Sequence, residues 1–296
     1  MSMRHEATVT SEPEGLLLAD KPAGRTSHDV VDLARRALRT KRVGHAGTLD
    51  PFATGLLVLL VGRATRLAPY LGNEPKVYEA TIRFGSETDS DDVTGSVTRE
   101  AAPPEDAAVR DALAAFTGAI TQLPPSVSAK QVGGVRAHAA ARQGAPLELS
   151  PVQVVVHGWD DVRFEGNELR ATITCGGGTY IRALARDLGR AVQSAAHCSA
   201  LRRTQTGLFD VADAVPALEF RERALDALRA PASGLCRTIA REALDDAGVR
   251  YVTQGRTVPA HASGDRAALL GPDGALVAIA ERQGDAWHPT VVLRDA

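Results

Sequence analysis

A single aspartate, Asp50, stands in a glycine-rich stretch at residues 44–55, directly before the apolar run at 56–61. The glycines permit positive φ angles and a close approach of the backbone to a ligand, and Pro51 fixes the chain after the acid. We therefore expect a rigid loop that presents the carboxylate. An ionised carboxylate can act as a nucleophile that adds to a carbon and later leaves, and a nearby cation would keep its pKa low. An aspartate before a proline is also a common turn former, so a purely structural role stays open on this stretch alone.

The periodicity of apolar residues predicts the elements that hold this loop. A buried strand at 15–20 leads into a helix that begins at Thr26 or Ser27 and continues to Leu38. Further strands are predicted at 56–61, 76–84, 152–159 and 168–175, helices at 105–116, 136–142 and 179–194, and an extended or turning segment at 121–128. A domain boundary is predicted near 231–234, followed by strands and turns at 250–296. Because strands and helices do not alternate regularly, the expected class is α+β with a mixed sheet.

Length and composition narrow the class of protein further. A chain of 296 residues predicts one large domain with a small appendage. The first fourteen residues are polar and the longest apolar run is too short to cross a bilayer, so we expect a cytoplasmic protein with no membrane partner. Three widely spaced cysteines, Cys175, Cys198 and Cys236, predict free thiols and no metal site.

The charge distribution points to a nucleic-acid partner although the net charge is only −2. Basic residues gather in three groups, which are Arg35, Arg36, Arg39, Lys41, Arg42, Arg63 and Arg66; Lys130, Arg136 and Arg142; and Arg182, Arg186, Arg190, Arg202 and Arg203. Acidic residues gather elsewhere in the sequence, as at Glu87, Asp89, Asp91 and Asp92. We interpret the basic groups as phosphate contacts, with solvated helix faces as the alternative for any one of them.

Two motifs resemble those of the bacterial TruB family, the tRNA pseudouridine synthases that act on uridine 55 in the T-loop. Residues 44–57 fill every specified position of the pattern Gly-His-x-Gly-Thr-Leu-Asp-Pro-x-Ala-Thr-Gly-x-Leu, and residues 21–27 read Lys-Pro-Ala-Gly-Arg-Thr-Ser. The resemblance covers about residues 14–210. It implies a pseudouridine-synthase fold with a mixed, largely antiparallel sheet flanked by helices. It also implies a catalytic domain at 1–235 with an RNA-gripping insertion at about 122–150, and a small β-rich PUA-like RNA-binding domain at 236–296.

The resemblance assigns the catalytic roles. Asp50 is the nucleophile, and Arg182, in the sequence Gly-Thr-Tyr-Ile-Arg, pairs with it. Tyr78 shares a face of the predicted strand with the core residues Ala80 and Ile82. By resemblance it stacks on the target base and serves as a general acid or base. Judged without the resemblance, Tyr78 would be an ordinary core residue.

The remaining site residues bind substrate by resemblance. His45, Tyr180 and Leu201 complete the pocket for a nucleotide flipped out of its stack, as a uridine inside a folded RNA arm requires. Lys21 supports the site or contacts a phosphate. The ordinary alternatives are a core role for Leu201, a loop hydrogen bond for His45 and a solvated loop position for Lys21.

The implied reaction breaks the bond from N1 to C1′, turns the uracil and joins C5 to C1′. It involves no net redox change and no outside atoms, so no cofactor is expected. The residues leave open whether Asp50 attacks C1′ or C6. We expect the T-arm of tRNA as the partner, no obligate protein partner and a monomer. A tRNA-folding chaperone and a guide-RNA-dependent enzyme like dyskerin are the alternatives, and Ala53 with the short C-terminal segment favours the stand-alone bacterial enzyme.

Overall fold

A ten-stranded mixed sheet forms the main body of the computed structural model, which describes residues 12–72, 74–127, 131–132, 135–136, 149–234 and 239–294. Along the sheet the strands are β14 (Val215–Pro216), β1 (Gly15–Lys21), β3 (Thr54–Val61), β12 (Ala196–Thr206), β4 (Lys76–Phe84), β11 (Glu168–Cys175), β10 (Val152–Glu165) and β7 (Gly118–Gln122). Strand β2 (Val43–Ala46) pairs with β3, and β13 (Phe209–Asp210) pairs with β12. The pairs β1 with β14 and β3 with β12 are parallel, and the other pairs of this sheet are antiparallel. The predicted mixed, largely antiparallel sheet is confirmed.

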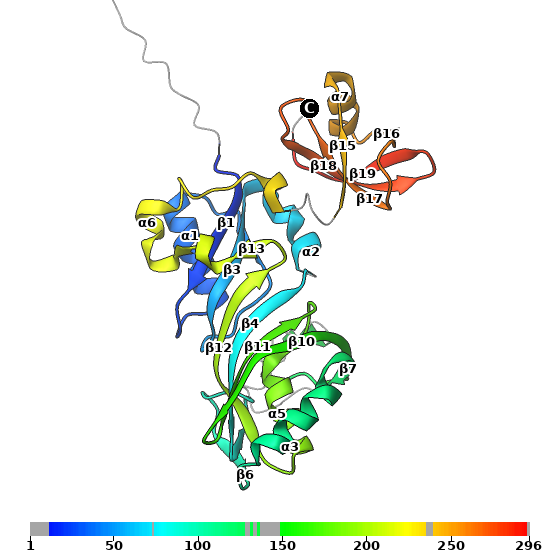
Figure 1. Cartoon of the computed structure of the whole chain (residues 1–296). Coiled ribbons are helices and arrows are strands. Elements are labelled where there is room, and N and C mark those ends of the chain that lie inside the picture. The colour runs from blue at the N-terminus through cyan, green and yellow to red at the C-terminus, as the bar shows by residue number, and fades with distance from the viewer. Residues whose placement is uncertain are drawn as a thin grey trace, which may run out of the picture.

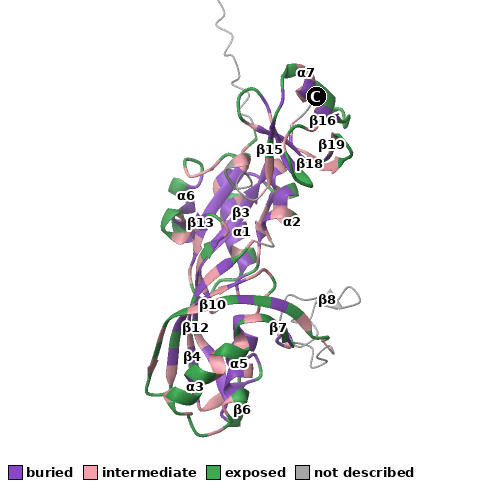
Figure 2. Ribbon diagram, turned by 45° about the vertical axis from the view of Figure 1, so that its right-hand side comes forward, coloured by how far each residue is buried: buried purple, intermediate pink, exposed green. Residues whose placement is uncertain are grey.

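Helices flank the two halves of this sheet (Figure 1). Helices α1 (Ser27–Leu38) and α6 (Phe220–Arg223) lie beside β1 and β3, whereas α3 (Asp106–Ala112) and α5 (Ile181–Ala191) lie beside β4, β11 and β10. Buried residues follow the sheet between these helices (Figure 2), and side chains of α1 and α5 belong to the same apolar core. Helix α1 begins as predicted, because the Thr26 hydroxyl accepts a bond from the Asp29 amide and the Asp29 carboxylate accepts one from the Thr26 amide. Among the described residues, no helix is both long and apolar enough to cross a membrane.

Most predicted elements are confirmed, but several were missed, among them β2, β7 and β12, and one helix was predicted wrongly. The strands predicted at 76–84 and 168–175 have those bounds as β4 and β11. The helix predicted at 136–142 is wrong at Arg136, which lies in β9 (Val135–Arg136) and pairs with β8 (Gln131–Val132), and residues 137–142 lie outside the described residues. Strand β12 was not predicted, since two irregularities in its pairing with β4 interrupt the alternation of its side chains.

The C-terminal part forms a separate five-stranded sheet. Its strands are β15 (Ala240–Ala243), β17 (Arg266–Leu270), β18 (Leu276–Gln283), β19 (Ala286–Val292) and β16 (Val258–Pro259), in that order. The predicted β-rich module is confirmed, but the prediction of strands and turns from residue 250 is wrong at its start. Residues 250–253 belong to helix α7 (Asp246–Thr253), where the Asp245 carboxylate accepts a bond from the Gly248 amide. The predicted domain boundary after residue 235 lies outside the described residues.

Two arginines that the sequence analysis interprets as phosphate contacts instead connect the main body to the C-terminal sheet through hydrogen bonds. Arg63 donates to the carbonyl of Leu293 over 3.0 Å, and Arg66 donates to the carbonyl of Val292 over 2.7 Å. Apolar side chains of β18 and of β1 and β3 also share one buried cluster. For these two arginines the interpretation as free phosphate contacts is therefore corrected.

A buried carboxylate, Glu242 of β15, organises the C-terminal sheet. It accepts hydrogen bonds from the amides of His261 (2.8 Å) and Ala262 (2.9 Å) and from Nε1 of Trp287 (2.8 Å). Burial works to raise the pKa of Glu242, but these donors outweigh it and lower the pKa to about 2. The charged form of Glu242 therefore stabilises this sheet.

We predict that Glu242→Gln loosens the C-terminal sheet at neutral pH, with a loss of about 2 kcal/mol for bonds donated to a charge. The pKa of Glu242 in the folded protein lies below its ordinary 4.5, so its stabilisation is present above pH 4.5. It is lost as the pH falls toward 2, where the variant and the wild type should converge. Amide hydrogen exchange in β17, β18 and β19 measures the effect. The control is Glu281→Gln in an exposed ion pair with Arg266, and equal protection of wild type and Glu242→Gln at pH 7 would contradict the prediction.

Candidate active site

The Asp50 loop connects β2 to β3 and depends on two glycines. Gly47 and Gly55 adopt φ angles of +95° and +100°, which side chains with a Cβ rarely reach. At Gly55 a Cβ would lie 2.2 Å from the carbonyl oxygen of Arg203, so the parallel pairing of β3 with β12 also requires glycine there. The loop therefore has the restricted backbone that the sequence predicted.

Arg203 of β12 holds the start and the end of this loop. Its side chain is fully buried, and it donates to the carbonyls of Leu56 (2.7 Å) and Gly47 (3.1 Å). The sequence shows Arg203 only as a member of a basic group. Membership of such a group does not tell whether an arginine is buried and bonded to the backbone or exposed and free to contact a phosphate. The assignment to phosphate binding is wrong for Arg203 because no part of its side chain reaches solvent.

Lys21 holds the residue that follows Asp50. Its ammonium is fully buried and donates to the carbonyls of Arg25 (2.6 Å), Pro22 (2.9 Å) and Pro51 (3.3 Å). Burial lowers the pKa of Lys21 to about 8, and Asp50 opposes this shift. The alternative of a solvated loop lysine is wrong, and complete burial favours support of the loop over contact with a phosphate.

Arg182 lies in the first turn of α5 and faces Asp50. Its Nε and Nη2 each donate to one oxygen of the Asp50 carboxylate over 2.9 Å, which is the two-point geometry expected of arginine and a carboxylate. Nη1 donates to the carbonyl of Ser90 (2.6 Å) and lies 3.3 Å from the Asp92 carboxylate, and Nη2 also donates to the carbonyl of Val127 (2.8 Å). The guanidinium thus donates four hydrogen bonds and has an ion pair with Asp92 besides. The structure brings Arg182 and Asp50 together as the sequence predicted.

The pKa of Asp50 moves in the opposite direction to our expectation. Removal of the carboxyl from water raises its pKa above the ordinary value for aspartate, while Arg182 and Lys21 work against this shift and Asp92 adds to it. The expectation of a lowered pKa is therefore wrong, because the cation offsets only part of the desolvation. A carboxylate with a raised pKa is more basic and a better nucleophile than an exposed one.

A cavity of about 250 Å³ opens beside this ion pair. Of the residues predicted for the site, the cavity is lined by Asp50, Tyr78, Tyr180, Arg182 and Leu201. Tyr78 and Leu201 are mostly buried, and burial raises the pKa of the Tyr78 phenol, with Arg203 opposing the shift. The phenol is thus protonated near neutral pH and can donate a proton or a hydrogen bond.

Two predicted residues lie outside the lining of this cavity. Lys21 sits beneath the loop, and His45 is a half-buried residue of β2 whose backbone pairs with Leu59. Tyr180, by contrast, is fixed at the rim. Its amide donates to Oε1 of Gln122 (3.1 Å), and Nε2 of Gln122 donates to its carbonyl (3.2 Å). These two bonds connect the start of α5 to the end of β7.

Sequence reasoning missed Lys76, which also lines the cavity. Its ammonium donates to the carbonyls of Gly72 and Glu74, each over 2.8 Å, and burial lowers its pKa to about 8. The signal was available, because Lys76 precedes Tyr78 by two residues and so shares its face of β4.

The acidic residues that are separated from the basic groups in the sequence form ion pairs with them in the structure. Asp91 pairs with Arg186 over 2.8 Å and Glu87 pairs with Arg190, so the basic face of α5 is neutralised within the protein. Lys130 and Arg142 lie outside the described residues. Counting charges along the sequence overestimated the number of cations left for phosphates.

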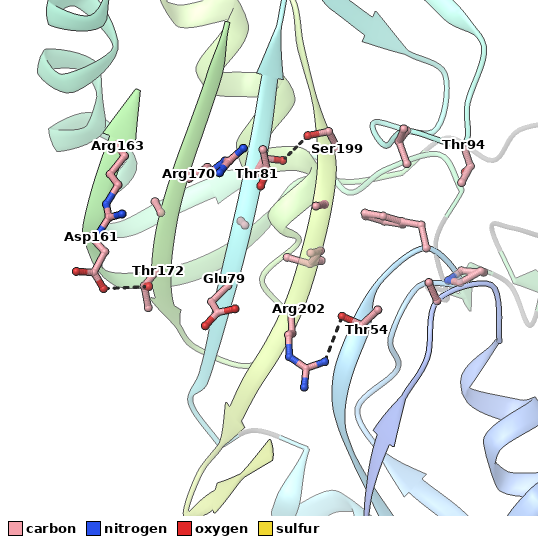
Figure 3. A pocket seen from close by; sticks show the side chains of 18 of the residues that line it. Thr54, Glu79, Thr81, Thr94, Asp161, Arg163, Arg170, Thr172, Ser199 and Arg202 are labelled. Atoms are coloured by element: carbon pink, nitrogen blue, oxygen red, sulfur yellow. Dashed lines mark hydrogen bonds between the residues drawn. The ribbon is translucent and has the colours of Figure 1, made fainter. Parts of the chain in front are cut away.

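A second cavity, of about 960 Å³, is lined by Glu79, Thr81 and Arg202 among others (Figure 3). These residues alternate along β4 and β12 with residues of the first cavity, so it lies mainly on the other face of the sheet, although Leu201 lines both. Arg202 points toward the second cavity and donates to Thr54 (3.5 Å), and it pairs with Asp20 over 2.8 Å. Arg202 and Arg203 are neighbours on β12 and therefore point to opposite faces. Arg202 thus connects β1 to β3 on one face, whereas Arg203 connects β3 to the Asp50 loop on the other. In the described part of the chain, no cluster of three or more histidine, cysteine or acidic residues could hold a metal ion.

Comparison with known proteins shows the fold and the family of this chain. The solved structure of the archaeal box H/ACA sRNP Nop10–Cbf5 complex superposes with a TM-score of 0.72 at 23% identity, covering 96% of this chain and 87% of the other. The model of the TruB family pseudouridylate synthase N-terminal domain matches residues 35–181. The tRNA pseudouridine synthase B of Thermobifida fusca is 43% identical over 95% of this chain and 98% of its own length, and that of Arthrobacter sp. is 42% identical over 94% and 96%. The chain belongs to the TruB family of pseudouridylate synthases.

We predict that the Asp50 carboxyl titrates above the ordinary aspartate pKa of about 3.9, because desolvation outweighs its pairing with Arg182. Carbon-13 NMR of the side-chain carboxyl measures this directly. Removing the ammonium in Lys21→Met should raise the pKa further, since Lys21 favours the charged form. A wild-type pKa at or below 3.9, or a fall in Lys21→Met, would contradict this account.

Proposed function

We propose that this chain converts uridine 55 in the T-loop of tRNA to pseudouridine, with Asp50 as the nucleophile. The observation that carries the proposal is the two-point pair of Asp50 and Arg182 at the wall of a cavity. Relatives named tRNA pseudouridine synthase B match over almost the whole chain and support the choice of substrate.

The geometry supports a division of labour in the reaction. Arg182 fixes both oxygens of Asp50, so the carboxylate is presented in one orientation when it adds to C1′ of the ribose or to C6 of the uracil. The raised pKa makes this carboxylate a stronger nucleophile, and the same ion pair stabilises the charge when Asp50 leaves. Breakage of the N1 to C1′ bond and formation of the C5 to C1′ bond are then completed by loss of the proton from C5 and protonation of N1.

The cavity is suited to a single flipped nucleotide. Its small volume excludes a stacked helix, so the target uridine must leave its stack to reach Asp50. Tyr78 and Leu201 supply an aromatic and an apolar surface for the base, and Tyr180 stands at the rim. The neutral phenol of Tyr78 is placed to exchange a proton with the base. His45, beside the loop in β2, contacts the nucleotide only from outside this cavity.

Phosphate contacts must come from cations that are not already paired within the protein. Arg36, Arg39, Lys41 and Arg42, at the end of α1 and before β2, are exposed and form a positive surface beside the end of β3 that is remote from the Asp50 loop. We assign the tRNA backbone to this surface. The enzyme acts as a monomer, with the C-terminal sheet as a PUA-like module that contacts the same RNA.

We predict that Asp50→Asn abolishes conversion of an unmodified T-arm stem-loop and leaves its dissociation constant within about two-fold, because the amide keeps the shape of the loop but is no nucleophile. Single-turnover kinetics with pseudouridine detection, together with filter binding, measure the two properties. The matched control is Asp161→Asn, an exposed residue of β10 at the cavity on the other face, which should convert at the wild-type rate. A wild type that binds the arm without converting it would favour a tRNA chaperone or a guide-dependent enzyme.

A further inference from the structure

Helix α5 carries three arginines at intervals of about one turn. All three contact the same segment of the chain, residues 87–92. Arg182 contacts Ser90 and Asp92, Arg186 pairs with Asp91, and Arg190 pairs with Glu87. The side chains of Arg186 and Asp91 are 7% and 8% exposed, so their pair is almost completely removed from water. Arg186 also pairs with Asp187 over 2.8 Å, so breaking the pair with Asp91 would leave the buried Asp91 carboxylate, rather than Arg186, without its ion-pair partner. The pair therefore fixes the geometry of the turn that carries Asp91.

Asp91 lies between the two residues that receive bonds from Arg182. Its own backbone is left-handed, with φ at +59°, a conformation that is uncommon outside glycine, asparagine and aspartate. The Asp91 amide donates to the carbonyl of Thr88 (3.1 Å), and its carbonyl accepts from the amide of Cys198 in β12 (3.0 Å). The bond from Arg186 to the Asp91 side chain completes this turn and so helps to fix where the Ser90 carbonyl points, whereas the Asp92 carboxylate is held by Ser90 and Thr94 within the same turn.

Arg186 also holds the second segment that Arg182 contacts. Its Nη2 donates to the carbonyl of Leu123 over 2.8 Å, four residues before Val127, whose carbonyl accepts from Arg182. The single guanidinium of Arg186 is therefore bonded to both stretches of chain that, together with Asp50, surround Arg182. It reaches them one helical turn away from Arg182 and lies outside the cavity lining.

We propose that Arg186 and Asp91 are positioning residues for catalysis, which act through Arg182 by fixing the acceptors that orient its guanidinium toward Asp50. Neither residue touches the substrate. The inference rests on the proposed function for its kinetic test, and it has a spectroscopic test that is independent of activity. The pair of Arg190 with Glu87 is built in the same way on the same helix, but neither residue contacts an acceptor of Arg182, and it serves as the internal comparison.

The kinetic experiment compares Asp91→Asn with Glu87→Gln. We expect Asp91→Asn to lower the single-turnover rate about 10- to 100-fold, the size typical of a small misplacement of reacting groups, with T-arm affinity within about two-fold. Glu87→Gln should keep the wild-type rate. An unchanged rate in a folded Asp91→Asn protein, or equal losses in both variants, would overturn the proposal. An inactive wild type would instead count against the proposed function.

The spectroscopic experiment follows the Nε–H of Arg182 by nitrogen-15 NMR in the free protein. In the wild type and in Glu87→Gln, this proton should exchange slowly with water because Asp50 accepts it. In Asp91→Asn it should exchange at least ten-fold faster, and an unchanged exchange rate would overturn the proposal even if activity fell. If Asp91→Asn does not fold, Arg186→Lys takes its place, because lysine keeps the charge opposite Asp91 but loses the planar fork that also reaches Leu123.

Discussion

The structure depends on one interaction, the two-point ion pair of Asp50 and Arg182 at the wall of a small cavity. Removing a guanidinium from water is costly unless every donor finds an acceptor. Arg182 is 2% exposed, and it donates to the Asp50 carboxylate and to two backbone carbonyls and forms an ion pair with Asp92. The arrangement leaves Asp50 ionisable but less well solvated, which is the condition that a nucleophilic carboxylate requires.

Asp50 and Arg182 are held in place by different elements of the fold. The Asp50 loop is held by Lys21 from β1 and by Arg203 from β12, both fully buried and both bonded to backbone carbonyls. Arg182 is presented by the first turn of α5, which Gln122 of β7 ties down at Tyr180. The cost of this geometry appears in the positive φ angles of Gly47, Gly55 and Asp91. Rigid elements on both sides of the cavity thus set the distance between the side chains of Asp50 and Arg182.

The sequence predicted those parts whose signal is local. Strict alternation gave β4 with its correct bounds, and a motif of fourteen residues with a family resemblance led to Asp50 and its pairing with Arg182. Prediction from the sequence failed where the contacts that decide the structure join residues far apart in the sequence. Asp91 and Arg186 lie 95 residues apart, so a count of charges along the chain could not see them neutralise one another. It also failed for β12, whose pairing irregularities break the alternation, and for the pKa of Asp50, whose sign depends on the balance of burial and charge.

The most direct test of this account is the single-turnover rate of Arg182→Lys on a T-arm stem-loop, measured beside its affinity for the same RNA. Lysine keeps the positive charge near Asp50 but cannot bind both carboxylate oxygens in a plane or satisfy the acceptors at Ser90 and Val127. If orientation of the carboxylate is what the fold is built to provide, the rate falls by about 100-fold or more while affinity stays within about two-fold. A lysine variant that converts uridine at the wild-type rate would contradict the account, because charge alone would then be sufficient.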